Sequence, residues 1–164
     1  MPRRTALIIA VPEAESLVSE LRRAHDPAAA RGVPAHVTLL FPFAPHDAIE
    51  EEALAELFGR FPAFAFALDR VERFDEGTVW LHPAPSTPFV DLTAAVRQRW
   101  PQYPPYEGIH DEVIPHLTVS EEPVEVDLPL PIACTAREVT LFEEDAQTGH
   151  WMVRRRFPLG QGVE

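Results

Sequence analysis

The stretch PAHVTLLFP at residues 34–42 carries the strongest indication of the fold, because the stretch IPHLTV at residues 114–119 repeats its pattern. Each contains a histidine and a threonine two residues apart, within a run of apolar and β-branched residues. Such a run favours a β-strand, and residues two apart on a strand point to the same face. Each strand is therefore expected to present one imidazole and one hydroxyl on one face and to bury apolar side chains on the other.

The regions around these two stretches also resemble each other. Residues 5–43 and 78–120 each predict a strand, a helix, a loop and a His-x-Thr strand in that order. Helices are expected at 13–25, 47–60 and 89–100, and strand pairs at 64–74 with 78–82 and at 134–144 with 151–157. Within the strand pairs, the spacing of Val71, Phe74 and Glu76 matches that of Val139, Phe142 and Glu144, and Trp80 is matched to Trp151.

This repetition predicts an α+β fold made of two similar lobes. We expect one bilobal domain over residues 1–164, with mostly antiparallel sheets around a central cleft and helices on the outside. The first motif lies at 36–38 and the second at 116–118, so the two His-x-Thr strands are expected to face each other. The 18 prolines are about twice the usual share of roughly 5%, which indicates short elements with stiff connections.

Charge and cysteine content narrow the class of protein. The net charge of −12 cannot supply the broad basic surface that long duplex nucleic acid requires, so a small or short-ended substrate is expected. Cys134 is the single cysteine, which favours a reducing compartment, and we expect a cytoplasmic monomer. The apolar run at 6–11 ends at acidic residues and is interpreted as a first strand, and no run approaches the ~20 residues of a membrane span.

Two imidazoles facing one cleft suit the cleavage of a phosphodiester bond. One removes a proton from the attacking oxygen, the other protonates the leaving oxygen, and neutral donors hold the non-bridging oxygens. Histidine can play either part because it titrates near neutrality. His36 and His116 are therefore the candidate catalytic residues, and the sequence leaves open which is the acid and which the base.

The paired motifs, PAHVTLLFP and IPHLTV, make the chain similar to the 2H phosphoesterase superfamily, and most of all to its 2′-5′ RNA ligase and cyclic-nucleotide phosphodiesterase branch. The resemblance implies a bilobal fold, catalysis by both histidines, and no required metal or other cofactor. It implies substrates with a 2′,3′-cyclic phosphate or a 2′-5′ linkage. Carried over by position, Thr38 and Thr118 take the phosphate-binding roles.

A few other residues are candidates for substrate contact. Tyr103 and Tyr106 lie in a proline-rich loop before the second motif, and Tyr106 is the better candidate for stacking on a base; packing on prolines is the alternative. Arg156 or Arg154, which share a strand face, is a candidate for meeting a phosphate, against the alternative of a charged edge strand. His110, Asp111 and Glu112 match no standard zinc spacing, so no metal site is expected.

The leading hypothesis is a phosphoesterase that opens a 2′,3′-cyclic phosphate to a 2′-phosphate. The reverse geometry, with an RNA 5′-hydroxyl as nucleophile, would join two ends through a 2′-5′ bond without ATP. The expected partner is thus a nucleotide or RNA end, with no long duplex and no membrane. The alternative hypotheses are a non-catalytic nucleotide- or RNA-end-binding protein with the same cleft and, third, a metal hydrolase.

Overall fold

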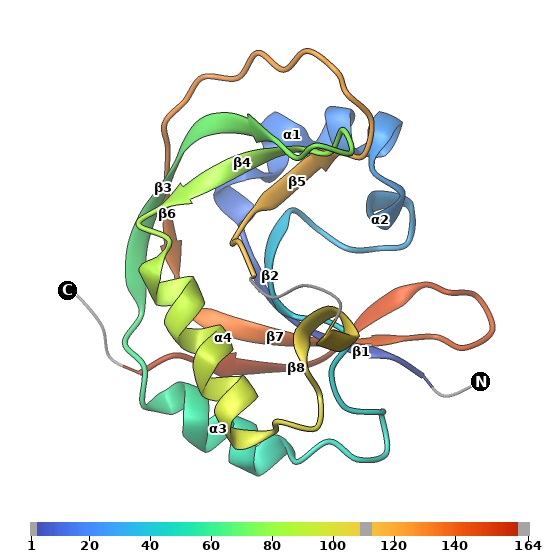
Figure 1. The fold of residues 1–164 in the computed structure, drawn as a ribbon, viewed down its shortest axis with the longest axis vertical. Helices are drawn as coiled ribbons and strands as arrows, with labels where there is room; N and C mark the ends of the chain where they lie inside the picture. Colours follow the sequence, from blue (N-terminus) through green and yellow to red (C-terminus); the bar gives the residue numbers. More distant parts are fainter. Residues whose placement is uncertain (1–2, 109–112, 161–164) are drawn as a thin grey trace.

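A computed structural model describes residues 3–108 and 113–160 and shows two lobes with a sheet in each (Figure 1). The elements, in chain order, are β1 (Thr5–Ala10), α1 (Pro12–His25), α2 (Pro27–Ala30), β2 (His36–Leu40), α3 (Glu51–Gly59), β3 (Phe64–Arg73), β4 (Val79–Ala84), α4 (Thr87–Arg99), the short 3₁₀ helix η1 (Pro105–Gly108), β5 (Leu117–Ser120), β6 (Ile132–Ala136), β7 (Glu138–Glu144) and β8 (Trp151–Pro158).

The order of strands confirms the predicted duplication. One sheet has the order β2-β1-β7-β8 and the other the order β5-β4-β3-β6, and every pairing within them is antiparallel. In each sheet the strand of the His-x-Thr motif lies at one edge, beside the strand that begins its repeat. The fold is therefore α+β with two related lobes, as the repeated element order predicts.

The helices of the two repeats are exchanged between the lobes. The α1 helix contacts β5 and β6, and α4 contacts β2, so each packs on the sheet that holds the other motif (Figure 1). The buried faces of the two helices carry Ala14 and Val18 in one and Phe89, Leu92 and Val96 in the other. The hydroxyl of Thr93 also donates to the carbonyl of Leu39 at 2.9 Å. This exchange holds the two motif strands in one body.

Along each motif strand, buried apolar side chains alternate with the histidine and threonine side chains, so the strand has one core face and one face turned away from this core. Val37 and Leu39 in β2, and Leu117 and Val119 in β5, are fully buried in one core shared by the lobes. A smaller cluster lies on the opposite face of the first sheet and contains Ala6, Ile8, Phe142 and Trp151. The core thus lies behind the motif strands, and the histidine and threonine side chains are left on the other face.

Two expectations about the second strand pair are wrong. Residues 134–144 form two strands, because β6 pairs with β3 whereas β7 pairs with β1 in the other sheet. Trp80 and Trp151 also do not correspond, since β4 occupies the place of β1 whereas β8 occupies that of β6. The match between the β3 and β7 segments agrees with the sheet order, because both strands lie third from the motif edge.

The helix expected over 47–60 begins at Glu51, four residues later than the expected Asp47 cap. The N–H of Ala48 donates to the carbonyl of Pro45 in a separate turn, and the carboxylate of Glu50 accepts from the indole N–H of Trp100 at 2.6 Å. The capping box is therefore absent, because its acid is used in a tertiary hydrogen bond. In the described part of the chain, no helix is long and apolar enough to cross a membrane.

Candidate active site

The two histidines are held by the same local contact. His36 begins β2 and its Nδ1–H donates to the carbonyl of Pro34 at 2.7 Å; His116 immediately precedes β5 and its Nδ1–H donates to the carbonyl of Ile114 at 2.7 Å. A carbonyl oxygen only accepts, so Nδ1 carries the proton in both rings. The Nε2 atom of each neutral ring is thereby left as the basic nitrogen.

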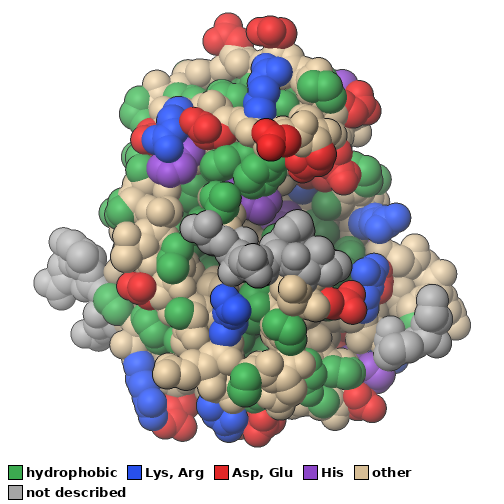
Figure 2. All heavy atoms as spheres, viewed as in Figure 1, with side chains coloured by type: hydrophobic (Ala, Val, Ile, Leu, Met, Phe, Trp, Pro, Cys, Tyr) green, Lys and Arg blue, Asp and Glu red, His purple; other side chains and the backbone are tan. Residues whose placement is uncertain are grey.

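Both imidazoles line one cavity of about 770 Å³, which opens between the lobes. Figure 2 shows this hollow with histidine side chains at its floor. A volume of this size accommodates a nucleotide, since small-molecule sites span roughly 300–1,000 Å³. The other lining residues are Asp26, Ala28, Phe74, Asp75, Glu76, Thr78, Tyr106, Ile114, Thr118 and Glu121.

The two motif threonines differ in their relation to this cavity. Thr118 is half-buried, lines the cavity and lies opposite Trp80 in the neighbouring strand. Thr38 is also half-buried and lies opposite Ile8, but it is not among the lining residues. The period of a strand still places Thr38 on the face of His36.

The environment lowers the pKa of both histidines. Burial lowers the pKa of His36 to about 4, with smaller lowering effects from the charges of Arg22 and His116. Burial also lowers the pKa of His116, whereas the carboxylate of Glu76 opposes this shift. The effect of His116 on His36 shows that the two rings lie within electrostatic reach of each other.

Arg22 is a buried residue beside the site that sequence reasoning missed. Its side chain is only 2% exposed; its Nε donates to Asp26 at 3.2 Å and its terminal nitrogen to the carbonyl of Val33 at 2.9 Å. Asp26 in turn accepts the N–H of Ala28 and lines the cavity. The four-residue spacing of Arg22 and Asp26 near the end of α1 was the available signal for this pair.

An aromatic pair beside His116 was also missed. The rings of Phe74 and Trp80 stack on each other with centroids 4.8 Å apart. The ring of His116 meets Phe74 edge-on at 5.1 Å and Trp80 at 5.8 Å. The β3–β4 hairpin brings Phe74 beside Trp80, and the pairing of β4 with β5 brings His116 to both. The local sequence around His116 gives no signal of this second pairing.

The loop before the second motif separates its two tyrosines. Tyr106 lines the cavity, and its backbone N–H donates to the carbonyl of Phe41 at 2.6 Å. Burial raises the pKa of its phenol. Tyr103 instead packs on the ring of Phe43 at 5.7 Å and belongs to the margin of the core.

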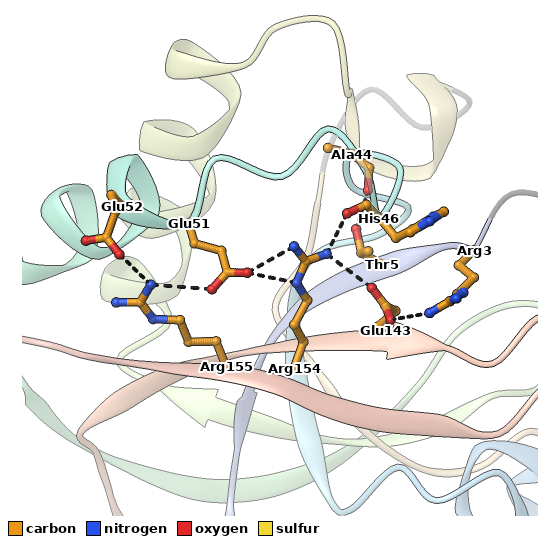
Figure 3. Close-up of polar contacts among 9 residues, drawn as sticks. All are labelled: Arg3, Thr5, Ala44, His46, Glu51, Glu52, Glu143, Arg154 and Arg155. Atoms are coloured by element: carbon orange, nitrogen blue, oxygen red, sulfur yellow. Dashed lines mark hydrogen bonds and ion pairs between the residues drawn. The ribbon is translucent and has the colours of Figure 1, made fainter.

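The three arginines of β8 are not among the residues that line the cavity. Residue 154 is an extra residue in its strand, because Val153 pairs with Phe142 and Arg155 with Leu141. Arg154 and Arg155, which alternation would place on opposite faces, therefore both reach Glu51 at the start of α3 (Figure 3). Arg156 pairs with Glu138 at 3.2 Å and is not among the residues that line the cavity.

The cavity is acidic apart from its histidines. Asp26, Asp75, Glu76 and Glu121 line it, and no lysine or arginine is found among its described lining residues. Over 3–108 and 113–160, no group of three or more His, Cys, Asp or Glu side chains is arranged to hold a metal ion. His110, Asp111 and Glu112 lie outside the described residues.

Comparison with solved structures identifies the fold. The Escherichia coli protein LigT with 3′-AMP matches at a TM-score of 0.72, with 23% identity over 98% of this chain and 100% of that one. LigT in its apo form matches at 0.68, with 25% identity over 98% and 99%. A Thermus thermophilus protein, TT0787, matches at 0.68, with 17% identity over 98% and 100%. LigT has also been solved with NADP+, phosphate and ATP.

No curated protein matches the chain significantly. The family model described as the 2′-5′ RNA ligase superfamily matches residues 10–155. That range includes both His-x-Thr motifs, α1, α4 and all or part of every strand. The resemblance that the paired motifs indicated is thus confirmed over most of the chain, and the chain belongs to the 2′-5′ RNA ligase superfamily, a group of 2H phosphoesterases.

Proposed function

We propose that this protein is a metal-independent phosphodiesterase that opens nucleoside or RNA-end 2′,3′-cyclic phosphates to 2′-phosphates, with His36 and His116 as its acid/base pair. The observation that supports this proposal best is that two imidazoles from different lobes line one cavity, and that each makes an equivalent hydrogen bond to a backbone carbonyl. That bond leaves Nε2 of each ring available for proton transfer. Binding alone would not need two matched basic nitrogens.

The proposed reaction is a displacement at phosphorus. One Nε2 takes a proton from water as its oxygen bonds to phosphorus, and the other imidazole, in its protonated form, gives a proton to the departing 3′-oxygen. The 2′-oxygen keeps the phosphate, and a proton returns between the histidines through solvent. If an RNA 5′-hydroxyl replaces water, the same steps form a 2′-5′ bond without ATP.

The threonine hydroxyls are proposed to hold the non-bridging oxygens of the phosphate. Thr118 lines the cavity two residues after His116, and Thr38 has the same spacing from His36. Neutral donors of this kind stabilise the charge that develops on these oxygens. Tyr106 is proposed to contact the nucleoside. Arg156 is left out of the proposal because it pairs with Glu138 outside the lining set.

The class of substrate follows from the cavity and the relatives. LigT has been crystallised with phosphate, 3′-AMP, ATP and NADP+, so that protein binds phosphate and nucleotides. The cavity of this chain is large enough for a nucleotide, but four carboxylates line it. A cyclic phosphate with a single negative charge suits it better than a polyanion.

The proposal is tested by incubating the protein with the four nucleoside 2′,3′-cyclic phosphates in EDTA and separating 2′- from 3′-phosphate products. We expect 2′-phosphates, and a loss of at least about 10²-fold in kcat for His36→Ala and for His116→Ala, the lower end of what one proton-transfer role contributes. His150→Ala is the matched control, because His150 is exposed and is not a lining residue.

Wild-type turnover in both motif variants would refute the proposal. A second candidate function is nucleotide or RNA-end binding without turnover, which the size of the cavity also permits. Tight nucleotide binding by calorimetry, with no product at high protein concentration, would favour it. Activity that disappears in EDTA and returns with a divalent metal would instead indicate a metal hydrolase.

A further inference from the structure

The two motif histidines are matched in their backbone tethers but differ in their neighbours. Thr38 lies opposite Ile8 across one strand pair, and Thr118 lies opposite Trp80 across the equivalent pair. The two sheets therefore place an aliphatic side chain beside the first motif and an indole beside the second. Trp80 is 6% exposed, so its ring is fixed by packing.

Three rings form a continuous contact around the second histidine. Phe74 and Trp80 stack with planes 29° apart, and His116 meets Phe74 at 81° and Trp80 at 70°. Such perpendicular contacts are preferred because the edge of one ring is positive and the face of another is negative. Within the described residues, no aromatic ring packs against His36 in this way.

The charges around the two histidines also differ. Glu76, two residues after Phe74, lines the cavity and favours the protonated form of His116. Arg22, on α1, favours the neutral form of His36, and Asp26 opposes it more weakly. The other titratable groups that line the cavity are Asp75, Glu121 and the phenol of Tyr106. The turn between β3 and β4 thus supplies both the ring that orients His116 and a carboxylate that favours its charged form.

We propose that Phe74 and Trp80 are positioning residues that hold the imidazole of His116 in the cavity. This inference rests on the proposed function for the proton-transfer role of His116, but not for the positioning itself. The aromatic support acts by holding Nε2 of His116 toward the phosphate.

The positioning role is tested by Trp80→Leu and Phe74→Leu, with Trp151→Leu as the matched control. Trp151 is a buried indole whose ring packs on Phe41, and among the described residues it makes no ring contact with either motif histidine. We expect kcat to fall at least about tenfold in the two test variants, with KM little changed, because a misdirected imidazole loses part of the about 10²–10⁴ that one proton-transfer role contributes. Trp80→Phe, which keeps a ring, is expected to restore most of kcat.

Imidazole NMR titrations give a readout that does not depend on turnover. In the wild type we expect His36 to titrate below His116. In Trp80→Leu or Phe74→Leu the titration of His116 moves toward the ordinary value while that of His36 stays, and in Trp151→Leu neither moves. If Trp80→Leu fails to fold, Phe74→Leu carries the test, because Phe74 is only half-buried. Equal effects of the test and control variants on His116 and on kcat would overturn the positioning role.

If the wild type opens no cyclic phosphate, the proposed function fails, while the NMR comparison still decides the positioning role.

Discussion

Protonation of His36 links the site to the stability of the fold. Its pKa is about 4 in the folded chain, against an ordinary value near 6.5 when unfolded. Between these values the unfolded chain binds more protons, so the free energy of unfolding decreases as the pH falls from 6.5 towards 4. The whole difference corresponds to at most about 3 to 4 kcal/mol. The burial that keeps this base neutral therefore costs stability in acid.

His36→Asn is expected to remove part of this dependence, because an amide does not titrate. Urea unfolding of the wild type should show a clear loss of stability between pH 7 and pH 5, and the variant should show a smaller loss. His150→Asn is the control, since His150 is exposed and is not a lining residue. Equal losses in wild type and His36→Asn would show that the burial of this histidine does not limit acid stability.

At the level of single residues, the sequence predicted what depends on local period and missed what depends on pairing. The two-residue spacing of His36 and Thr38 fixes their common face wherever the strand lies. Phe74 and Trp80 meet His116 only because β4 pairs with β5 in one register. Tyr106 could be predicted as a candidate because it lies in the loop before the second motif. Its place in the cavity, however, depends on the hydrogen bond from its backbone N–H to the carbonyl of Phe41.

The attachment of α3 to the first sheet depends on a bulge in β8. Because residue 154 is an extra residue in the strand, Arg154 reaches Glu51, Glu143 and the carbonyl of His46 at once (Figure 3). The carbonyl contact measures 2.6 Å, and the arginine side chain is three-quarters buried. One side chain thus joins β8, β7, α3 and the loop that follows β2.

Arg154→Ala is expected to lower the free energy of unfolding by about 1–3 kcal/mol, because it leaves partly buried acceptors without their donor. Arg156→Ala in the same strand is the matched control: its ion pair with Glu138 is exposed, so we expect about 0–1 kcal/mol. Urea unfolding at pH 7 measures both. If the two variants lose the same stability, the contacts of Arg154 do not anchor α3.

The ends of helices and strands were predictable where a residue such as proline marks them, and not where such a residue is absent. Proline residues frame α1 and α4, and both helices were placed within two residues at each end. The β6–β7 crossing has no such mark, since only Arg137 separates two apolar strands. The start of α3 was misplaced because the acid of its apparent capping box bonds to Trp100, a partner 50 residues away.

The architecture of the whole molecule follows from a repeat, but the exchange of helices does not. The repeated order of elements predicted two related lobes and two facing motifs. Nothing in that order says that α1 packs on β5 while α4 packs on β2, because both helices present ordinary apolar faces. This exchange joins the lobes through one core, and the cavity between them is bounded by side chains from both repeats.

The charge of that cavity makes a prediction about salt. A protein that neutralises the phosphates of a nucleic acid displaces the cations bound to them. Its affinity therefore falls as the salt concentration rises. Here four carboxylates line the cavity, and none of its described lining residues is a lysine or arginine. Salt then screens repulsion rather than attraction, so the KM for a 2′,3′-cyclic mononucleotide should stay level or fall between low and high NaCl. Steady-state kinetics in both conditions measures this.

Glu76→Gln separates the local effect from the charge of the whole chain. Removing one lining carboxylate from a protein of net charge −12 changes the overall charge little but lowers the repulsion next to His116. The variant should therefore bind the cyclic phosphate with a lower KM at low salt. The titration of His116 should also move to lower pH, because its protonated form has lost a supporting charge. Glu20→Gln, exposed on α1 and not among the lining residues, is the control and should change neither. A KM that rises steeply with salt in the wild type would mean that a basic group outside the described lining binds the phosphate.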